Sequence, residues 1–467
     1  MLNHFFFRDF NGKKLITNDF GRYSFLSDIE FNQLLSDEIS KESSKYQELK
    51  EKFFLYEGNK EVFLQEVRDH ARYSRSYLFS ATALFIFVVT NRCNANCLYC
   101  QAKDSSSLNN GMMSFETAER GVDIALESPV GHINIEFQGG EPLINFPVIK
   151  HIVEYANEKA KASNKRITYS LVSNLTLLTD EIKTFIKENN VGLSTSLDGD
   201  KETHDFNRPL HGDKPSFDLV LDKIKEAKED GLRIGAIETT TSKTLSRYKE
   251  LVDTYIDNEV GTIFIRPLTP LGVAKERWSE IGYTPEEYVE FYRNCIAYIL
   301  QKNIEGHRIS EGHAKIFLSK MLYGDGVNYM ELRSPCGASI GQIAIYHDGR
   351  VFTCDEGRML AEMGNDAFKL GTIENTYDEL INSSVCKTAC TASILETIPA
   401  CCDCAYSPYC GTCPVINLAF DNDIFARTPR NYRCKVYEGM MTVLFEVLER
   451  NDPQEIEILE AWARGEF

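Results

Sequence analysis

Three cysteines lie close together in the sequence, directly after a short apolar segment. Cys93, Cys97 and Cys100 form a C-x3-C-x2-C pattern that follows the apolar residues 84–89. Three thiolates at the end of a buried strand can hold a cubane iron–sulfur cluster. Because a four-iron cluster with only three protein thiolates keeps one iron open to an outside ligand, this pattern indicates catalysis rather than plain electron storage.

The segments around the cysteine run alternate between strand-like and helix-like patterns. Six strands are expected, at residues 84–90, 132–137, 167–173, 192–198, 233–240 and 263–268, with helical stretches between them. Repeated strand–helix units predict an α/β protein with a parallel sheet that is either barrel-like or doubly wound. In both arrangements the active site forms at the carboxyl ends of the strands.

Residues suited to chemistry follow several of these expected strands. They comprise the cysteine run after the first strand, Gly139-Gly140-Glu141-Pro142 after the second, Asn174 after the third, Ser196-Leu197-Asp198-Gly199 at the fourth and Arg266-Pro267 at the sixth. Because parallel strands end at the same edge of a sheet, the sequence predicts one site built from this set.

Length, composition and charge restrict the class of protein. The 467 residues are too many for one ordinary core, so two or three domains are expected. No apolar run reaches membrane-spanning length and the first residues lack a secretory pattern, which favours the cytoplasm and no membrane partner. In a reducing cytoplasm the 14 cysteines indicate metal or cluster ligands rather than disulfides. The net charge of −18 disfavours a nucleic-acid partner.

The cysteine run and the Gly-Gly-Glu-Pro element together resemble the radical S-adenosylmethionine (SAM) superfamily over residues 83–275. The resemblance implies a partial (β/α)6 TIM-like barrel, a [4Fe–4S] cluster on Cys93, Cys97 and Cys100, and SAM ligating its fourth iron. It implies that SAM is bound by Tyr99, Gly139, Gly140, Glu141, Asn174, Ser196, Asp198, Arg208 and Arg266. Glycines let a ligand approach the backbone, Glu141 would receive the SAM amino group, and arginine pairs with a carboxylate.

Most of the remaining cysteines lie between Cys336 and Cys434, in a region that resembles the SPASM domain of peptide-modifying radical SAM enzymes. That resemblance implies two auxiliary [4Fe–4S] clusters, one on Cys401, Cys404, Cys410 and Cys434, and one on Cys336, Cys354 and Cys413. The last spacing of the central motif is x2 where the family has x3. A fourth ligand for the second cluster is not evident, so either one of Cys386, Cys390 and Cys402 completes it or an iron stays open. Zinc is the alternative, because C-x2-C pairs suit it equally well.

The first 80 residues predict a small domain without cysteines. Strands are expected at 5–10, 13–17 and 21–25, and helices at 27–35, 44–54 and 61–73, the first of them with a capping box from Ser27 to Glu30. An open strand edge suits capture of an extended peptide by strand addition, and a plain cap on the larger domain is the alternative. A short pattern, Phe7-Arg8-x-Phe10-x-Gly12, is similar to the winged-helix-like leader-binding element of peptide maturases, which resembles the D-type protein of pyrroloquinoline-quinone synthesis.

The resemblance also implies an order of domains and a reaction. The domains would be a leader-recognition domain at 1–80, the barrel at 83–275, a helical linker at 276–335, the SPASM domain at 336–434 and a C-terminal helix at 435–467. The chain most resembles the maturases of His-Xaa-Ser systems, partly through the Arg-Pro-Leu-x-Pro-x-Gly segment that starts at Arg266. A 5′-deoxyadenosyl radical would remove hydrogen from a precursor peptide bound through its leader, with flavodoxin or ferredoxin as reductant.

The expected product is an intrapeptide crosslink, with a C–C cyclophane-type bond favoured over a thioether. Asp355 follows Cys354 at the position where sulfatase-maturing relatives place a proton acceptor, so Asp355 is the expected general base and Glu356 the second choice. A sulfatase-type (formylglycine) maturase, a peptide epimerase and a zinc-binding module without catalysis are the alternatives.

Overall fold

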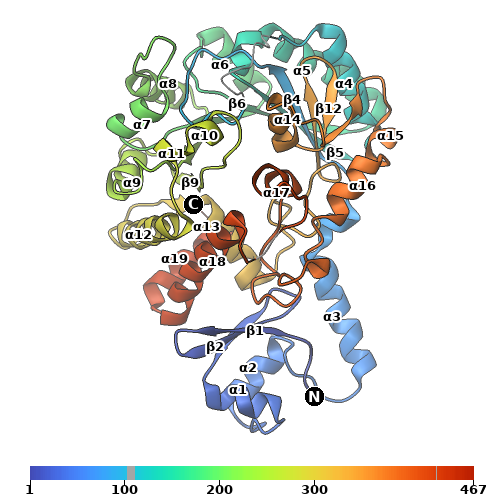
Figure 1. Ribbon diagram of the computed structural model, residues 1–467, viewed down its shortest axis with the longest axis vertical. Helices are drawn as coiled ribbons and strands as arrows, with labels where there is room; N and C mark the ends of the chain where they lie inside the picture. Colours follow the sequence, from blue (N-terminus) through green and yellow to red (C-terminus); the bar gives the residue numbers. More distant parts are fainter. Residues whose placement is uncertain (103–110, 427–428, 467) are drawn as a thin grey trace.

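The computed structural model describes residues 1–102, 111–426 and 429–466 (Figure 1). Its central feature is a ten-stranded sheet with the order β10-β9-β8-β7-β6-β5-β4-β11-β12-β13. The six predicted strands are confirmed as β4 (Leu84–Thr90), β5 (His132–Gly139), β6 (Arg166–Val172), β7 (Val191–Ser196), β8 (Ile234–Thr239) and β9 (Thr262–Arg266). Adjacent members of this set pair in parallel, as strand–helix alternation requires.

Two further segments extend the sheet beyond the predicted strands. The region expected to be a purely helical linker contributes β10 (Ser310–Glu311), which pairs in parallel with β9. At the other edge, β11 (Gln342–Tyr346) pairs in parallel with β4, and β12 (Arg350–Phe352) and β13 (Lys369–Thr372) continue as antiparallel strands. The cysteine-rich region therefore shares its sheet with the barrel region, because β11 lies directly beside the strand that leads into Cys93.

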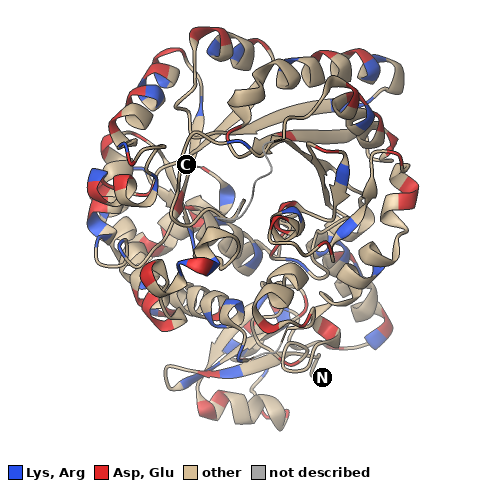
Figure 2. Cartoon of the chain, turned by 45° about the horizontal axis from the view of Figure 1, so that its top comes forward, with Lys and Arg blue, Asp and Glu red and all other residues tan. Residues whose placement is uncertain are grey.

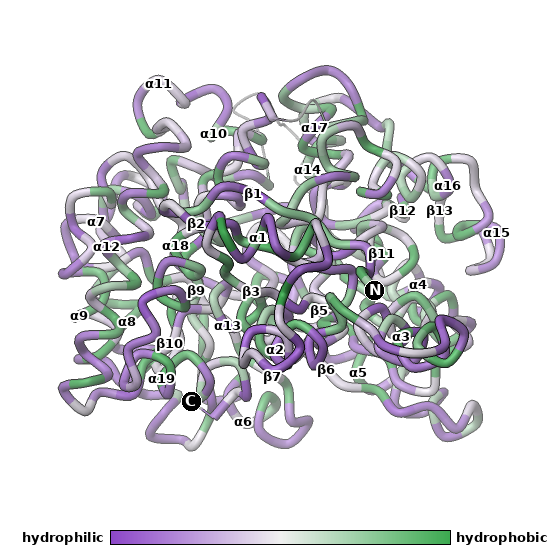
Figure 3. The backbone as a smooth tube through the Cα atoms, turned by 90° about the horizontal axis from the view of Figure 1, so that it is seen from below, coloured by the Kyte–Doolittle hydropathy of each residue, from purple (hydrophilic) through white to green (hydrophobic). Residues whose placement is uncertain are grey.

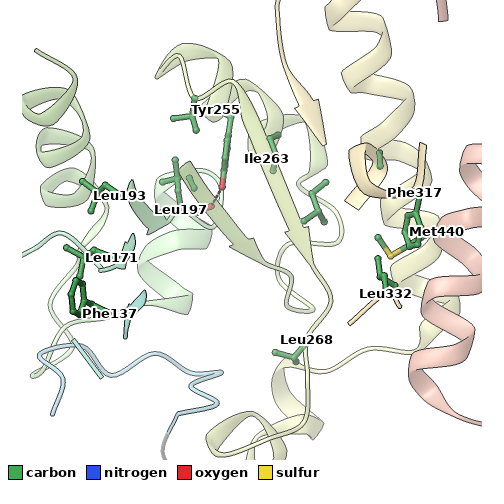
Figure 4. Close-up of a cluster of buried hydrophobic side chains, with 14 of the residues drawn as sticks. Phe137, Leu171, Leu193, Leu197, Tyr255, Ile263, Leu268, Phe317, Leu332 and Met440 are labelled. Carbon is green, nitrogen blue, oxygen red and sulfur yellow. Dashed lines mark hydrogen bonds between the residues drawn. The ribbon is translucent and has the colours of Figure 1, made fainter. Parts of the chain in front are cut away.

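Amphipathic helices cover the outside of the sheet. They are α4 (Phe115–Glu127), α5 (Phe146–Ser163), α6 (Asp180–Glu188), α7 (Lys201–Asn207), α8 (Phe217–Glu229) and α9 (Tyr248–Asp257). Figure 2 shows the charged residues along these outer helices, as expected when their apolar faces pack on the strands. The buried side chains Phe137, Leu171 and Leu193 come from consecutive strands, and the same core continues to Met440 of the C-terminal region (Figure 4).

The remaining helices connect and cover the second half of the chain. They are α10 (Val273–Glu276), α11 (Trp278–Ile281), α12 (Pro285–Ile304), α13 (Gly312–Leu318), α14 (Asp355–Glu362), α15 (Tyr377–Ile381), α16 (Ser384–Thr391), α17 (Pro414–Asp421), α18 (Tyr432–Arg450) and α19 (Pro453–Arg464), with short turns at Ser76–Phe79, Pro142–Asn145, Ser319–Tyr323 and Leu395–Thr397. The expectation of one C-terminal helix is wrong, because Asn451 adopts a left-handed conformation and Pro453 starts a new helix. No helix among the described residues is long and apolar enough to cross a membrane.

The N-terminal elements closely follow the sequence expectation. Strands β1 (Phe6–Phe10), β2 (Lys13–Thr17) and β3 (Tyr23–Leu26) form a three-stranded antiparallel sheet, followed by α1 (Asp28–Leu35), α2 (Ser44–Glu51) and α3 (Lys60–Ser74). The predicted capping box is confirmed, since the side chains of Ser27 and Glu30 each bond to the other residue's backbone N–H. Figure 3, viewed from below, shows β1, β2 and α1 lying across the rest of the molecule.

Candidate active site

A cavity of about 230 Å³ opens at the carboxyl ends of the parallel strands. Most of the predicted cluster and SAM ligands line it, from five different strand ends or the loops after them: Cys93, Cys97, Tyr99, Cys100, Gly139, Gly140, Asn174, Ser196, Arg208 and Arg266. Two predicted residues, Glu141 and Asp198, are not among the lining residues. The fold thus gathers predicted ligands up to 173 positions apart in the sequence around one space.

The three clustered cysteines face this cavity. Burial, reinforced by the neighbouring Cys97 sulfur, raises the pKa of the Cys93 thiol to about 12, so a positively charged partner is needed to hold these sulfurs as thiolates. In the described part of the chain, no three His, Cys, Asp or Glu side chains converge closely enough for a single metal ion. In an iron–sulfur cubane each thiolate binds a different iron, so three cysteines that line one cavity can hold three of its corners.

The glycine pair lets the end of β5 approach the cysteine loop. A Cβ atom on Gly139 would lie 2.4 Å from the carbonyl oxygen of Thr90, and one on Gly140 would lie 2.3 Å from that of Arg92. The N–H groups of Gly140 and Glu141 donate to those same two carbonyls, at 2.9 and 2.8 Å. Only glycine fits at these positions, because the clash would be with backbone atoms that carry the cysteine loop.

Glu141 does not reach the cavity as the sequence analysis expected. Its side chain is 1% exposed and accepts hydrogen bonds from Leu143 N–H (3.1 Å), Ser173 Oγ (2.7 Å) and Asn174 N–H (2.8 Å). Burial raises the pKa of this carboxyl to about 7, although the three donors oppose the shift. Glu141 therefore positions Ser173 and Asn174, which line the cavity.

Asp198 also lies beneath the cavity instead of facing it. One oxygen of this fully buried carboxylate accepts from Tyr99 OH (2.5 Å) and Arg208 Nε (2.9 Å), and the other accepts from Thr239 N–H (3.2 Å). The Arg208 guanidinium lies 5.0 Å from the centre of the Tyr99 ring. The carboxylate thereby fixes a tyrosine and an arginine that do line the cavity.

His204 completes this layer without reaching the cavity. Its Nδ1 accepts a hydrogen bond of 3.3 Å from the backbone N–H of Asp198, and burial lowers its pKa to about 4. A neutral histidine that accepts from the backbone has a structural role here.

The two predicted groups of auxiliary cysteines each come together. Cys336, Cys354 and Cys413 are buried in one apolar cluster, and the sulfurs of Cys336 and Cys413 both act on the Cys354 thiol, whose pKa burial and these neighbours raise. Around Cys410, burial and the sulfurs of Cys404 and Cys401 raise the thiol pKa to about 12. Cys434, at the start of α18, has Cys410, Cys401 and Cys404 as electrostatic neighbours.

The expected general base has a different environment from its neighbour. Asp355 accepts hydrogen bonds from the buried Arg358 guanidinium, through Nε at 3.1 Å and through Nη2. Burial, together with Glu331 and Asp355, raises the pKa of Glu356 to about 7. Asp355 is thus held in an ion pair, whereas burial favours the protonated form of Glu356, and neither residue is among those that line the cavity.

Sequence reasoning missed Met359 and Glu331. Met359 on α14 lines the cavity, and since Cys354 caps the same helix, α14 links the cavity to the trio Cys336, Cys354 and Cys413. Glu331 bridges Arg266 (3.4 Å) and Arg433 (2.8 Å) below the cavity rim. No motif surrounds either residue, so only the packing of distant elements reveals them.

Residues 87–254 match the profile of the Radical SAM superfamily. The uncharacterized protein MJ0907 of Methanocaldococcus jannaschii is 37% identical over 185 residues, which cover 40% of this chain and 62% of that protein, so the chain spans less than two thirds of this relative. A cysteine-type anaerobic sulfatase-maturating enzyme of Clostridium novyi is 26% identical over 336 residues, 70% of this chain and 86% of that enzyme.

Two solved structures share the fold over most of the chain. Native anSMEcpe with bound AdoMet has a TM-score of 0.68 at 22% identity and covers 81% of this chain and 99% of its own. Streptococcus suis SuiB bound to its precursor peptide SuiA has a TM-score of 0.55 at 16% identity and covers 92% of this chain and 99% of its own. At such identities the likeness establishes the fold.

Proposed function

We propose that this chain is a radical SAM enzyme and that its substrate is a ribosomally synthesised precursor peptide. The observation that carries the proposal is the cavity itself. It is lined by the cysteine run and by the glycine pair, and also by Met359 of α14, next to the cysteines expected to hold an auxiliary cluster. A peptide side chain in this space would lie between the radical source and an electron acceptor.

The residues around the cavity suit one [4Fe–4S] cluster and SAM. Cys93, Cys97 and Cys100 would hold three irons, and SAM would bind the fourth. The backbone of Gly139 and Gly140, the side chains of Asn174 and Ser196, and the cations Arg208 and Arg266 would surround SAM. When bound, these groups supply the one-electron chemistry that yields a 5′-deoxyadenosyl radical able to remove hydrogen from an unactivated carbon.

The auxiliary cysteines support two more [4Fe–4S] clusters in a SPASM-type domain. One would be bound by Cys401, Cys404, Cys410 and Cys434, and the other by Cys336, Cys354 and Cys413. Glu356 is the preferred base for the proton that the substrate releases, with Asp355 second, which reverses the order expected from sequence.

The N-terminal sheet supports leader recognition. Among the described residues, β1 and β3 each pair with β2 alone. The Lys45 side chain already donates to the Phe25 carbonyl of β3, so the outer edge of β1 is the better one to accept an extended peptide. Beside β1, the exposed Phe7 ring lies 4.9 Å from Phe31, and Ile29 on α1 is 72% exposed. An apolar surface next to a free strand edge suits a leader that adds as a strand and places apolar side chains against α1.

Within this class we favour an intrapeptide C–C crosslink, and the segment from Arg266 to Gly272 supports a likeness to the His-Xaa-Ser maturases. Sulfatase-type maturation is the second candidate, because the Clostridium novyi enzyme aligns over 70% of this chain. The two differ in product, since a crosslink joins two residues whereas a formylglycine carries an aldehyde.

The test is co-expression with candidate precursor peptides from neighbouring genes, followed by mass spectrometry. A crosslink removes two hydrogens and suppresses fragmentation between the joined residues. Oxidation of serine to formylglycine also removes two hydrogens, so an aldehyde-reactive hydrazide distinguishes the two products. Epimerisation leaves the mass unchanged in ordinary water. A peptide that stays unmodified with every neighbouring precursor, while purified enzyme still cleaves SAM, would contradict the substrate assignment.

Two cysteine variants test the assigned roles of the clusters. Cys97→Ala is expected to abolish formation of 5′-deoxyadenosine. Cys404→Ala is expected to retain part of this cleavage but to stop product formation, because the proposed auxiliary cluster acts after hydrogen removal. Cys402→Ala, in the same loop, is the matched control and should keep both activities. Formation of 5′-deoxyadenosine by Cys97→Ala at the wild-type rate would show that the SAM-binding cluster lies elsewhere.

A further inference from the structure

The auxiliary site of Cys336, Cys354 and Cys413 has three predicted thiolates where a four-iron cluster offers four positions. We propose that Cys390, on α16, is the fourth ligand, which leaves this cluster with no iron open to substrate or solvent. The proposal rests on the proposed function, because it presupposes that the trio holds a cluster. It gives a role to one of the spare cysteines and restricts what this cluster can do.

The backbone near Cys336 is tied directly to the end of α16. The N–H of Cys336 donates to Ser393 Oγ at 3.0 Å. The same hydroxyl donates to the carbonyl oxygens of Ala389 (2.8 Å) and Cys390 (3.1 Å). A single serine thus joins the first residue of the trio to the helix turn that carries Cys390.

One side chain on that turn belongs to the same apolar cluster as the trio. Ala389, next to Cys390 in the helix, is 3% exposed and packs in the cluster that contains Cys336, Cys354 and Cys413. Cys390 itself is partly buried. The turn that carries Cys390 therefore lies at the edge of the apolar cluster that contains the trio, with the Cys390 side chain partly buried.

A shared cation gives a second indication that the sulfurs of Cys336 and Cys390 are neighbours. The guanidinium of Arg333 has both thiols as electrostatic partners, and the Cys336 sulfur is among the groups that raise the pKa of the Cys390 thiol, after Cys386 and burial. The two sulfurs therefore lie close enough for their charges to interact. A cation beside them would stabilise the additional negative charge of a fully thiolate-ligated cluster.

The other spare cysteines are less well placed. Cys402 lies beside Asp403 (3.7 Å) and lines a different cavity together with Arg75 and Lys320, next to the cluster expected on Cys401 and its partners. Cys386 shares a hydrogen bond with Cys390 but lies one helical turn farther from Ser393. A turn corresponds to about 5 Å along the helix axis.

Full thiolate coordination decides the role of this cluster. On binding, the Cys390 thiol would lose its proton to solvent and its sulfur would displace any solvent ligand from the fourth iron. An iron without an open position cannot bind a substrate thiol or hydroxyl. The cluster would then act by accepting an electron from the substrate radical, and substrate would be held by protein contacts alone.

The experiment removes the SAM-binding cluster so that only the auxiliary clusters remain. In a parent with Cys93, Cys97 and Cys100 changed to Ala, we compare Cys390→Ala with the matched controls Cys386→Ala and Cys402→Ala after anaerobic reconstitution. The readouts are iron and sulfide per chain and the electron paramagnetic resonance spectrum after reduction, with and without cyanide, which binds an open iron. No substrate and no activity are needed.

Cys390→Ala is expected either to lose up to about half of the iron or to keep it with a spectrum that changes on adding cyanide. The parent, Cys386→Ala and Cys402→Ala should keep their iron and show no response to cyanide. If Cys390→Ala is insoluble, Cys390→Ser decides, because a serine oxygen can ligate iron and should shift the spectrum of one cluster.

Several results would overturn the assignment. They are a cyanide response in the parent, a Cys390→Ala or Cys390→Ser spectrum identical to that of the parent, and a loss seen only in Cys386→Ala or Cys402→Ala. These results would leave the proposed function intact. A parent without iron and sulfide would overturn both proposals, because no auxiliary cluster would exist.

Discussion

Two adjacent carboxylates, Asp355 and Glu356, illustrate how single residues divide their roles. They share a helix turn after Cys354, yet Asp355 forms an ion pair with Arg358, which is 1% exposed, whereas Glu356 accepts no bond from another described side chain. The sequence places two acids side by side here, and resemblance favoured Asp355 as the base. Their chemistry differs because the helix turns one toward a buried cation and the other toward Arg266 and Glu331.

Exchanging each carboxylate for its amide should separate structure from proton transfer. Asp355→Asn leaves the buried Arg358 charge without its partner and is expected to lower stability by about 3 kcal/mol. Glu356→Gln should melt close to wild type and still form 5′-deoxyadenosine, but make product about 100-fold more slowly. Thermal melting and single-turnover assays measure both. Glu356→Gln with an unchanged rate of product formation would remove this residue from the list of bases.

A buried carboxyl that does not line the cavity makes the stability of the protein depend on pH. Glu311 is 0% exposed and accepts from Tyr292 OH and from backbone N–H groups, and burial raises its pKa to about 7 from an ordinary 4.5. Between these two values the folded state binds more protons than the unfolded state. The contribution of Glu311 to stability therefore falls as pH rises through this window, by about 3 kcal/mol in all.

Glu311→Gln should remove this dependence. We expect the melting temperature of wild type to fall relative to that of the variant between pH 5 and pH 8, although the variant starts lower because an amide is a poorer acceptor. Glu457→Gln, at an exposed position of α19, is the control and should give a constant difference. A difference between wild type and Glu311→Gln that stays constant across this range would mean that Glu311 is already ionised at pH 5.

At the scale of elements, the end of β5 and the loop after β4 form one unit. The N–H groups of Gly140 and Glu141 bond to the carbonyls of Thr90 and Arg92, and no side chain can be inserted between them. The glycine pair therefore acts on the cluster site through the backbone, in addition to lining the cavity.

Gly140→Ala tests this coupling. The new methyl group would meet the Arg92 carbonyl at 2.3 Å, so the cysteine loop must shift. We expect the iron bound by Cys93, Cys97 and Cys100 and the formation of 5′-deoxyadenosine to fall at least about tenfold. Gly192→Ala is the matched control on β7, where the nearest atom lies at 3.6 Å, and it should keep both. Normal cluster content in Gly140→Ala would show that the loop adapts without loss.

At the scale of the whole molecule, the N-terminal domain packs on the loop that carries Cys401, Cys404 and Cys410. Thr17 Oγ1 donates to the Ala405 carbonyl (2.7 Å), and Tyr409 OH donates to the Gly21 carbonyl (3.1 Å). The ring of Tyr23 packs against Phe445 of α18 at 5.2 Å. Deleting residues 1–80 therefore uncovers loop 401–410 and does more than remove a peptide-binding surface.

Truncation and a surface substitution in this domain should consequently differ in their effect on iron content. The chain without residues 1–80 is expected to lose about a third of its iron, because one of the three proposed clusters, that of Cys401, Cys404, Cys410 and Cys434, becomes exposed. Phe7→Glu, at a 53% exposed position, should keep all its iron and yet bind a leader peptide at least about tenfold more weakly. Iron analysis and fluorescence anisotropy measure these effects. Leader binding that is unchanged in Phe7→Glu would favour the plain cap.

Local pattern in the sequence determined much of this protein. The spacing of Cys93, Cys97 and Cys100, the alternation that gave β4 to β9, and the Ser27 capping box are all local features, and the structure contains each of them. A strand end or a helix cap depends on neighbouring residues, so the sequence alone could place most of the residues that line the cavity.

Only the tertiary structure decided which polar groups face that cavity. Glu141 and Asp198 stand at the predicted strand ends, but their carboxylates do not line the cavity. Their oxygens accept hydrogen bonds from Ser173, Asn174, Tyr99 and Arg208 instead. Likewise, Cys390 lies near Cys336 because α16 packs beside the segment before β11, which lies some 50 residues earlier in the chain. Burial forces each polar group to find a partner, and those partners come from segments that only folding brings together.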